Sequence, residues 1–346
     1  MSDKARSLVS QIGEKSLNRF FVGTTTINSP NQIHHIDVSE DVSTIDRVAV
    51  YDHTHEIWQM AACPLNKDLL ITVYNTVPEF KASLWKINER SKKLEELTQL
   101  SEPSGSIKSV LWQPTEESES RIVASLSNSC IKLWDLTDSK EILHIDSGEL
   151  NNLSTGCWHK YVLQDLLTVA CGPDIIGFDT RQKSKSYTIK SSCYGDVRDL
   201  EVNPNIPYIF VSGGDDCLIK FWDQRNYSKP LKILKKNAHW VWAVKYNPRF
   251  DSLVLSSSTD GSVALWNVQS LAFKNPSIPR KDSAVKSTDR LIKTYDDHED
   301  SVYSICWSAC DERTWDWATF ASLSYDGRVV VNRVPEADAR QALGAL

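Results

Sequence analysis

Residues that could form a catalytic Ser-His-Asp set recur in this sequence at regular intervals. A serine bonded to a histidine, which an aspartate orients, is the arrangement of a hydrolytic nucleophile. An active site needs to exist only once, however, whereas these groups recur. We therefore interpret them as structural hydrogen-bond networks, because each buried polar group left unpaired costs roughly 1–3 kcal/mol. The sets are His53, Thr72 and Trp85; Ser212, Asp216 and Trp222; Ser256, Asp260 and Trp266; and His298, Ser322 and Asp326.

The repeated unit that must position these groups is clearest in the stretch 208–225, YIFVSGGDDCLIKFWDQR. Two runs of apolar and β-branched residues flank a Gly-Gly-Asp-Asp cluster, which is the pattern of a β-hairpin. A period in the forties with a terminal Trp-Asp predicts an all-β, single-domain, seven-bladed WD-repeat β-propeller. The equivalent aromatic positions are Trp85, Trp134, Phe178, Trp222 and Trp266, at spacings of 49, 44, 44 and 44 residues.

Seven copies of such a unit fill nearly all of the 346 residues. We expect the propeller to span 19–334, with a flexible, Ser/Lys/Pro-rich insertion at 268–290 and a tail at 335–346. Propellers usually close with a strand from one terminus beside strands from the other, because an open ring leaves an unpaired edge. Neither terminus supplies an obvious strand here, although the segment 1–18 offers 5–10 as a possible closing strand.

Composition narrows the classes of function. A net charge of −6 and a pI near 5.8 give no basic footprint for nucleic acid. No apolar run approaches the roughly 18 residues of a membrane span, and the start lacks the core of a secretory signal. The eight cysteines include no Cys-x-x-Cys pair, so we expect reduced, buried thiols and no metal site. Without a phosphate loop or a metal cluster, the sequence predicts neither an enzyme nor a cofactor.

A candidate protein-binding surface lies where the inner strands of the predicted blades begin. In WD propellers, the residues that flank the first apolar residue of that strand, and the one before the turn aspartate, emerge on one face. Aromatic residues and arginine dominate the hot spots of protein interfaces, and an apolar centre with a charged rim is a common design. Packing of Trp58 and Trp242 between blades is the alternative interpretation. The predicted residues are Glu56, Trp58, Asp196, Arg198, Asp215, Trp240, Trp242, Tyr303 and Tyr325, with Thr259 and Ser301 at equivalent positions and the acids forming the rim.

Two consecutive repeats end in Asp-x-Arg, with Asp179 and Arg181 in one and Asp223 and Arg225 in the next. Propellers that dock onto the adaptor of a cullin-RING ubiquitin ligase often carry such paired motifs, whose exposed arginines reach the partner. The alternative is that each arginine pairs with a neighbouring aspartate on the same face, which is common at surfaces. A substrate receptor of a ubiquitin ligase is therefore the second functional hypothesis.

The chain also resembles one WD-repeat family, the EARP and GARP complex-interacting proteins, from about residue 5 to 335. The strings that carry the likeness are RFFVGT at 19–24, NQIH at 31–34, EIW at 56–58, VRDL at 197–200, GDDC at 214–217, KFWD at 220–223, HWVW at 239–242, HEDSVY at 298–303, FASLSYDGR at 320–328 and NRVP at 332–335. The resemblance implies a non-enzymatic adaptor that binds multisubunit tethering complexes. It also implies a role in endosomal recycling and endosome-to-trans-Golgi transport, in the cytoplasm and peripherally at those membranes. The sequence departs from the family ahead of 4–6 and after Pro335.

Overall fold

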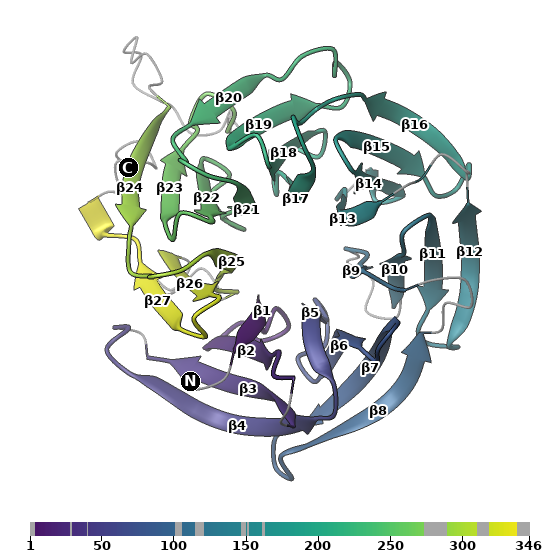
Figure 1. Cartoon of the computed structure of the whole chain (residues 1–346), viewed down its shortest axis with the longest axis vertical. Coiled ribbons are helices and arrows are strands. Elements are labelled where there is room, and N and C mark those ends of the chain that lie inside the picture. Colours follow the sequence, from purple (N-terminus) through teal and green to yellow (C-terminus); the bar gives the residue numbers. More distant parts are fainter. Residues whose placement is uncertain are drawn as a thin grey trace.

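The computed structural model describes residues 4–27, 30–39, 41–100, 106–114, 121–146, 150, 152–160, 163–272, 289–309 and 318–337. Within these residues, antiparallel sheets follow one another around a central axis in the order of the chain (Figure 1). The seven-bladed β-propeller predicted from the repeat is thereby confirmed. No helix in this part of the chain is long and apolar enough to span a membrane.

Each blade is built from strands that are consecutive in the chain, and the innermost strand comes first (Figure 1). Blade one contains β1 (Ala5–Ser10), β2 (Asn18–Thr24), β3 (Asn31–Val38) and β4 (Ile45–His53). Blade two contains β5 (Glu56–Ala62), β6 (Leu69–Asn75), β7 (Phe80–Asn88) and β8 (Lys93–Leu100), and blade three contains β9 (Ser109–Trp112), β10 (Ile122–Leu126), β11 (Cys130–Asp135) and β12 (Lys140–Asp146).

The remaining blades repeat this arrangement, except that blade seven has three described strands. Blade four contains β13 (Leu153–Trp158), β14 (Leu166–Cys171), β15 (Asp174–Asp179) and β16 (Ser184–Ile189). Blade five contains β17 (Val197–Val202), β18 (Ile209–Gly214), β19 (Leu218–Asp223) and β20 (Lys232–Lys235). Blade six contains β21 (Val241–Tyr246), β22 (Leu253–Ser258), β23 (Val263–Asn267) and β24 (Arg290–Tyr295), and blade seven contains β25 (Val302–Trp307), β26 (Thr319–Ser324) and β27 (Val329–Arg333).

The core lies between neighbouring blades. Strands β14, β18, β22 and β26 are buried along their whole length, because both faces of each sheet pack against another sheet. Outer strands alternate instead: in β12, Leu143 and Ile145 are buried, whereas Ile142, His144 and Asp146 are exposed. The largest fully buried side chains include Phe178, Phe210 and Phe320. Each lies in a buried cluster, and Phe178 is one of the repeated aromatic positions.

The recurring polar groups form hydrogen bonds within a blade or between a blade and the segment that leads into it. Thr72 Oγ1 of blade two lies 3.2 Å from Nε2 of His53, at the end of β4, and accepts the Trp85 indole N–H at 2.8 Å. Burial lowers the pKa of His53 to about 4, so its ring is neutral near pH 7. In blade seven, His298 Nε2 lies 2.8 Å from Ser322 Oγ. These contacts match the structural interpretation of the repeated sets.

Blade four has a network that the sequence did not reveal. Phe178 takes the tryptophan position and cannot donate a hydrogen bond. The Tyr187 hydroxyl, from the outer strand, lies 2.6 Å from Thr168 Oγ1 instead, and His159 Nε2 lies 2.8 Å from the same oxygen. A residue two strands away therefore replaces the missing indole.

The ring closes without a strand shared between the two ends of the chain. β1 hydrogen-bonds to β2 of its own blade, and no backbone ladder joins blades one and seven in the described part. β1 lies beside β25 and β26 (Figure 1), and Ala5 and Leu8 share a buried cluster with Ala321 and Leu323. The propeller therefore begins at Ala5, earlier than the expected residue 19, and the first strand completes blade one rather than blade seven.

Blade six takes up both ends of the expected insertion, 268–290. Val268 is fully buried in the cluster between blades five and six, and Arg290 begins β24. Asp289 accepts a hydrogen bond from the Ser270 backbone N–H at 2.8 Å, which joins the two ends. Residues 273–288 of the insertion and 338–346 of the expected tail lie outside the described residues.

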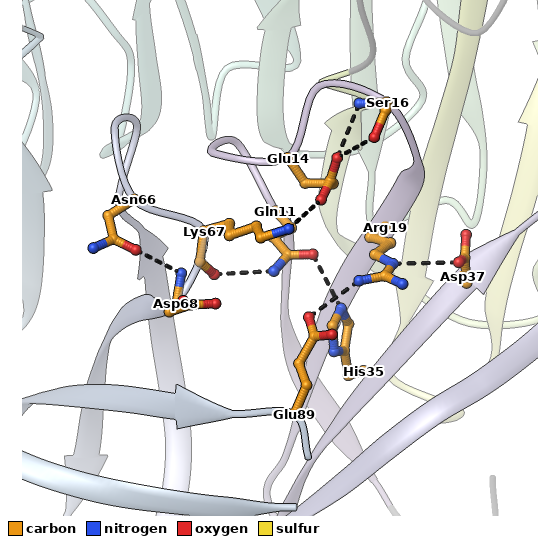
Figure 2. Close-up of polar contacts among 10 residues, drawn as sticks. All are labelled: Gln11, Glu14, Ser16, Arg19, His35, Asp37, Asn66, Lys67, Asp68 and Glu89. Carbon is orange, nitrogen blue, oxygen red and sulfur yellow. Dashed lines mark hydrogen bonds and ion pairs between the residues drawn. The ribbon is translucent and has the colours of Figure 1, made fainter.

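The loop between β1 and β2 connects blade one to blade two at the C-terminal ends of the inner strands (Figure 2). Gln11 Nε2 donates to the backbone oxygen of Lys67 at 2.9 Å, and Lys67 Nζ lies 2.9 Å from Glu14 Oε2. Arg19 of β2 pairs with Glu89 of blade two at 3.0 Å. These contacts fix β1, and the side chains that it carries, against blade two.

Candidate partner-binding site at the entrance face

The entrance face is the face of the ring on which the inner strands begin. Among the described blades, six inner strands lose register with the second strand directly after their first buried apolar residue. Such a β-bulge leaves a residue unpaired and re-aims its side chain. The residues at the bulges are Arg6, Trp58, Arg198, Trp242 and Tyr303, with Ser154 and Thr155 in blade four.

Four rings from blades six and seven form one aromatic cluster on this face: Trp240, Trp242, Tyr303 and Tyr325. The centroid distances are 6.4 Å between the two tryptophans, 4.9 Å between Trp242 and Tyr303, and 5.8 Å between the two tyrosines. All three contacts are edge-on, a favourable geometry for aromatic pairs. Trp240 and Tyr325 remain 39% and 40% exposed, whereas the other two rings are half-buried. The aromatic cluster thus presents two exposed rings above a packed base.

Arg198 lies against the aromatic cluster and is oriented by Asp215. Its guanidinium is 5.4 Å from the Trp240 centroid and 5.0 Å from that of Trp242. Two of its nitrogens donate to the Asp215 carboxylate at 2.6 and 2.7 Å. This carboxylate, whose side chain is only 14% exposed, also accepts the backbone N–H of Asp196 at 3.1 Å. Asp215, which the sequence analysis placed in the acidic rim, is therefore paired, because both of its oxygens accept hydrogen bonds.

Blade one contributes two cations that the sequence-based site omitted. Lys4 Nζ lies 4.4 Å from the Tyr325 centroid and donates to its hydroxyl at 3.1 Å. The Arg6 guanidinium lies 4.2 Å from the Trp58 centroid and 5.2 Å from that of Tyr303. Cation–π contacts of this kind are favourable when partly desolvated. Arg6 therefore joins the aromatic surface of blade seven to that of blade two.

Polar contacts also lie on the entrance face. Glu56 accepts a hydrogen bond from Asn75 at 3.0 Å, and Asp196 accepts one from Asn152 at 3.4 Å. Lys108 Nζ donates to the amide oxygen of Asn152 at 3.2 Å. Aromatic and cationic side chains thus run from blade five through seven and one to blade two, while blades three and four present a polar arc.

Comparison with known proteins places the chain in a family. The EIPR1 beta-propeller family model matches residues 1–266, and the WD domain, G-beta repeat model matches residues 289–331. The chain belongs to the EIPR1 beta-propeller family. It is 35% identical over 374 aligned positions to EARP and GARP complex-interacting protein 1 of Rattus norvegicus, covering 96% of this chain and 95% of the relative. It is also 35% identical to the EARP-interacting protein homolog of Gekko japonicus and 34% identical to EARP and GARP complex-interacting protein 1 of Homo sapiens, at the same coverage. The resemblance seen in the motifs is confirmed.

In this EIPR1-type propeller, Trp58 and Trp242 both pack between neighbours and contribute to the entrance face. Trp58 meets Phe80 edge-on at a centroid distance of 5.2 Å. The indole nitrogens of both tryptophans are covered and have no hydrogen-bond partner among the residues that the structure places. Both rings remain partly exposed. The packing interpretation therefore holds for one edge of each ring, and the other edge belongs to the entrance face.

Arg6 could have been found from its place in the repeat. Residues 4–6 follow the same pattern as 196–198 and 240–242, in which a buried apolar residue separates two residues that reach the entrance face. The shortness and polarity of the segment 5–10 obscure this correspondence in the sequence. Ser301 corresponds to Trp240 in the repeat, and Thr259 corresponds to Tyr325. The Ser301 hydroxyl donates to the Thr259 backbone oxygen at 3.3 Å.

The two Asp-x-Arg motifs lie elsewhere, along a hollow between blades four and five that Asp179, Arg181 and Arg225 all line. Arg225 donates to both oxygens of Asp223 at 3.0 and 2.7 Å, and Arg181 Nε lies 3.2 Å from an Asp165 oxygen. Each arginine thus pairs with an aspartate of its own surface. Both arginine side chains nevertheless remain exposed, at 71% for Arg181 and 60% for Arg225. In the part of the chain that the structure describes, no cluster of three or more His, Cys, Asp or Glu could hold a metal ion.

Proposed function

We propose that this protein is a non-enzymatic adaptor that binds the EARP and GARP tethering complexes through its entrance face. By the same proposal it supports endosomal recycling and endosome-to-trans-Golgi transport from the cytoplasm, peripherally at those membranes. The names of relatives that match over 95% of their length support the choice of partner. The aromatic cluster, with two rings about 40% exposed beside cations, is the observation that supports the choice of surface.

The entrance face has the chemistry of a protein interface. Trp240 and Tyr325 offer large apolar area with little conformational freedom to lose, and Arg198 is already held in place by Asp215. Anchors of these three residue types carry most of the energy at many interfaces. Because the base of the aromatic cluster is packed, a partner would meet a surface that needs little rearrangement before binding.

The test is quantitative binding of the purified chain to a purified EARP or GARP complex. Truncating a buried aromatic anchor costs at least about 2 kcal/mol, which is roughly thirtyfold in affinity. We therefore expect the Trp240→Ala, Tyr325→Ala double variant to bind at least about thirtyfold more weakly. Tyr227→Ala is the matched control, because Tyr227 is equally exposed, at 39%, but lies in the hollow between blades four and five. A folded double variant that binds like the parent would place the contact on another face.

A second candidate function is a substrate receptor of a cullin-RING ubiquitin ligase, because Arg181 and Arg225 are exposed along one hollow. The Arg181→Ala, Arg225→Ala double variant separates the two functions. We expect it to keep its affinity for the tethering complex. Loss of that binding in a folded variant, or loss of co-purification with the purified ligase adaptor, would favour the second function.

A further inference from the structure

Arg6 carries a charge that no described side chain neutralises. Its guanidinium is half-buried between the rings of Trp58 and Tyr303. Among the described residues, it has neither a carboxylate within ion-pair distance nor a hydrogen-bond acceptor. The contrast is Arg198, at the equivalent bulge of blade five, whose charge is matched by both oxygens of Asp215.

The surroundings of Arg6 disfavour its positive charge. Burial lowers the pKa of the Arg6 guanidinium, and repulsion from Arg198 acts in the same direction, while the phenols of Tyr303 and Tyr325 act against both. An arginine nonetheless stays protonated in proteins. Desolvating a charge without a partner is costly. A guanidinium has five N–H donors, so an anion supplied by a partner would stabilise Arg6.

We propose that the entrance face binds an aspartate or glutamate side chain of an extended partner segment, with Arg6 as the bidentate partner of the carboxylate. Trp240 and Tyr325 would contact an apolar residue next to that acid. This inference rests on the proposed function and names the chemistry that the adaptor surface recognises. The planar fork of arginine matches a carboxylate with two parallel hydrogen bonds.

The acidic residues of the same face favour a carboxylate over a phosphate. Glu56 precedes Trp58 by two residues, and Asp196 precedes Arg198 by two residues, so both acids lie at the start of their inner strands on this face. A phosphoryl group carries about −1.5 to −2 charges near pH 7. These acids would repel it more strongly than a singly charged carboxylate.

The first experiment needs no tethering complex. The side-chain Nε–Hε signals of arginine are followed by NMR in the full chain, with Arg6 assigned from the Arg6→Lys variant. The probes are N-acetylglutamate methylamide, its neutral glutamine counterpart and inorganic phosphate. We expect the Arg6 signal to shift with the glutamate probe and not with the glutamine probe. Equal shifts with both, no shift with either, or a shift with phosphate alone would overturn the carboxylate assignment.

The second experiment measures binding to the purified tethering complex. Arg6→Gln should weaken it by about tenfold or more, mainly through faster dissociation, and should reduce its dependence on salt. Arg6→Lys keeps the charge but cannot form two parallel hydrogen bonds with a carboxylate. Its affinity for the tethering complex should lie between those of Arg6→Gln and the parent. Lys108→Gln is the matched control, because this cation occupies the equivalent position in blade three but already bonds to Asn152.

The two proposals fail in different ways. If the Trp240→Ala, Tyr325→Ala variant loses binding while folded Arg6→Gln binds like the parent, the entrance face is the adaptor surface but the carboxylate inference is wrong. If all these variants bind like the parent, the proposed surface itself is wrong. The NMR titration decides the carboxylate question even if Arg6→Gln does not fold.

Discussion

Glu14 should stabilise the propeller through its charge, and Glu14→Gln is the variant that isolates this contribution. The carboxylate is 8% exposed and sits in the loop that joins blade one to blade two (Figure 2). It accepts hydrogen bonds from the Ser16 backbone N–H at 3.0 Å and the Ser16 hydroxyl at 2.5 Å, and it pairs with Lys67 at 2.9 Å. Burial favours the neutral form, but the hydrogen bonds from Ser16 and Lys67 outweigh it and lower the pKa of Glu14 to about 2.

The size and direction of the pH effect follow from this pKa. A pKa of about 2 in the folded protein, against about 4.5 in the unfolded chain, corresponds to about 2–4 kcal/mol of stability at pH 7. Because the folded pKa is the lower one, the contribution is complete above about pH 5 and disappears as the pH falls towards 2. Glutamine has no charge to lose, so the difference between the parent and Glu14→Gln should shrink over the same interval.

The assay is urea unfolding followed by tryptophan fluorescence at several pH values between 7 and about 3. Asp41→Asn serves as the control. The hydrogen bonds of Ser43 and Ser39 also lower the pKa of Asp41 to about 2, but this carboxylate is fully exposed and should contribute far less to stability. A difference between parent and Glu14→Gln that stays constant with pH would refute the reasoning, because it would show lost packing rather than lost charge.

Two further predictions concern single positions. Asp215→Asn should weaken binding to the tethering complex by about tenfold or more in a titration with purified components, because it frees Arg198 from a two-point contact; unchanged affinity would show that Arg198 needs no fixing. Gly13→Ala should lower the free energy of unfolding by about 1–3 kcal/mol in urea titrations, because an added Cβ would lie 2.4 Å from the Lys67 backbone nitrogen; a variant as stable as the parent would show that the loop can move away.

The sequence predicted the architecture well because the propeller is a local repeat. Spacings of 44 and 49 residues between aromatic positions report a strand order that never leaves the blade. Closure could not be predicted in the same way, since it depends on Leu8 meeting Leu323 across nearly the whole chain. No pattern within a single blade reports such a contact.

The predicted site shows a similar division. The repeat register indicated which positions reach the entrance face, including Trp240 and Tyr325. Register does not specify whether an acid there faces solvent or a neighbouring cation, so it does not predict the pairing of Asp215 with Arg198. Tyr187 shows the same limit in the core, because its hydroxyl reaches Thr168 from two strands away. Pairings between side chains depend on rotamers and distances that residue type and spacing do not specify.

Blades one and seven pack together without sharing a strand, and this arrangement bears on how the protein folds during synthesis. Because every blade uses consecutive strands, a nascent chain can complete each sheet before the next one has been synthesised, and domains and subdomains generally form in that order. In that order, the docking of blade seven against blade one comes last. Lys4 and Arg6 reach Tyr325 and Tyr303 only across this seam. A chain stopped short of blade seven therefore lacks Tyr303 and Tyr325, so the proposed binding surface is complete only after blade seven has been synthesised.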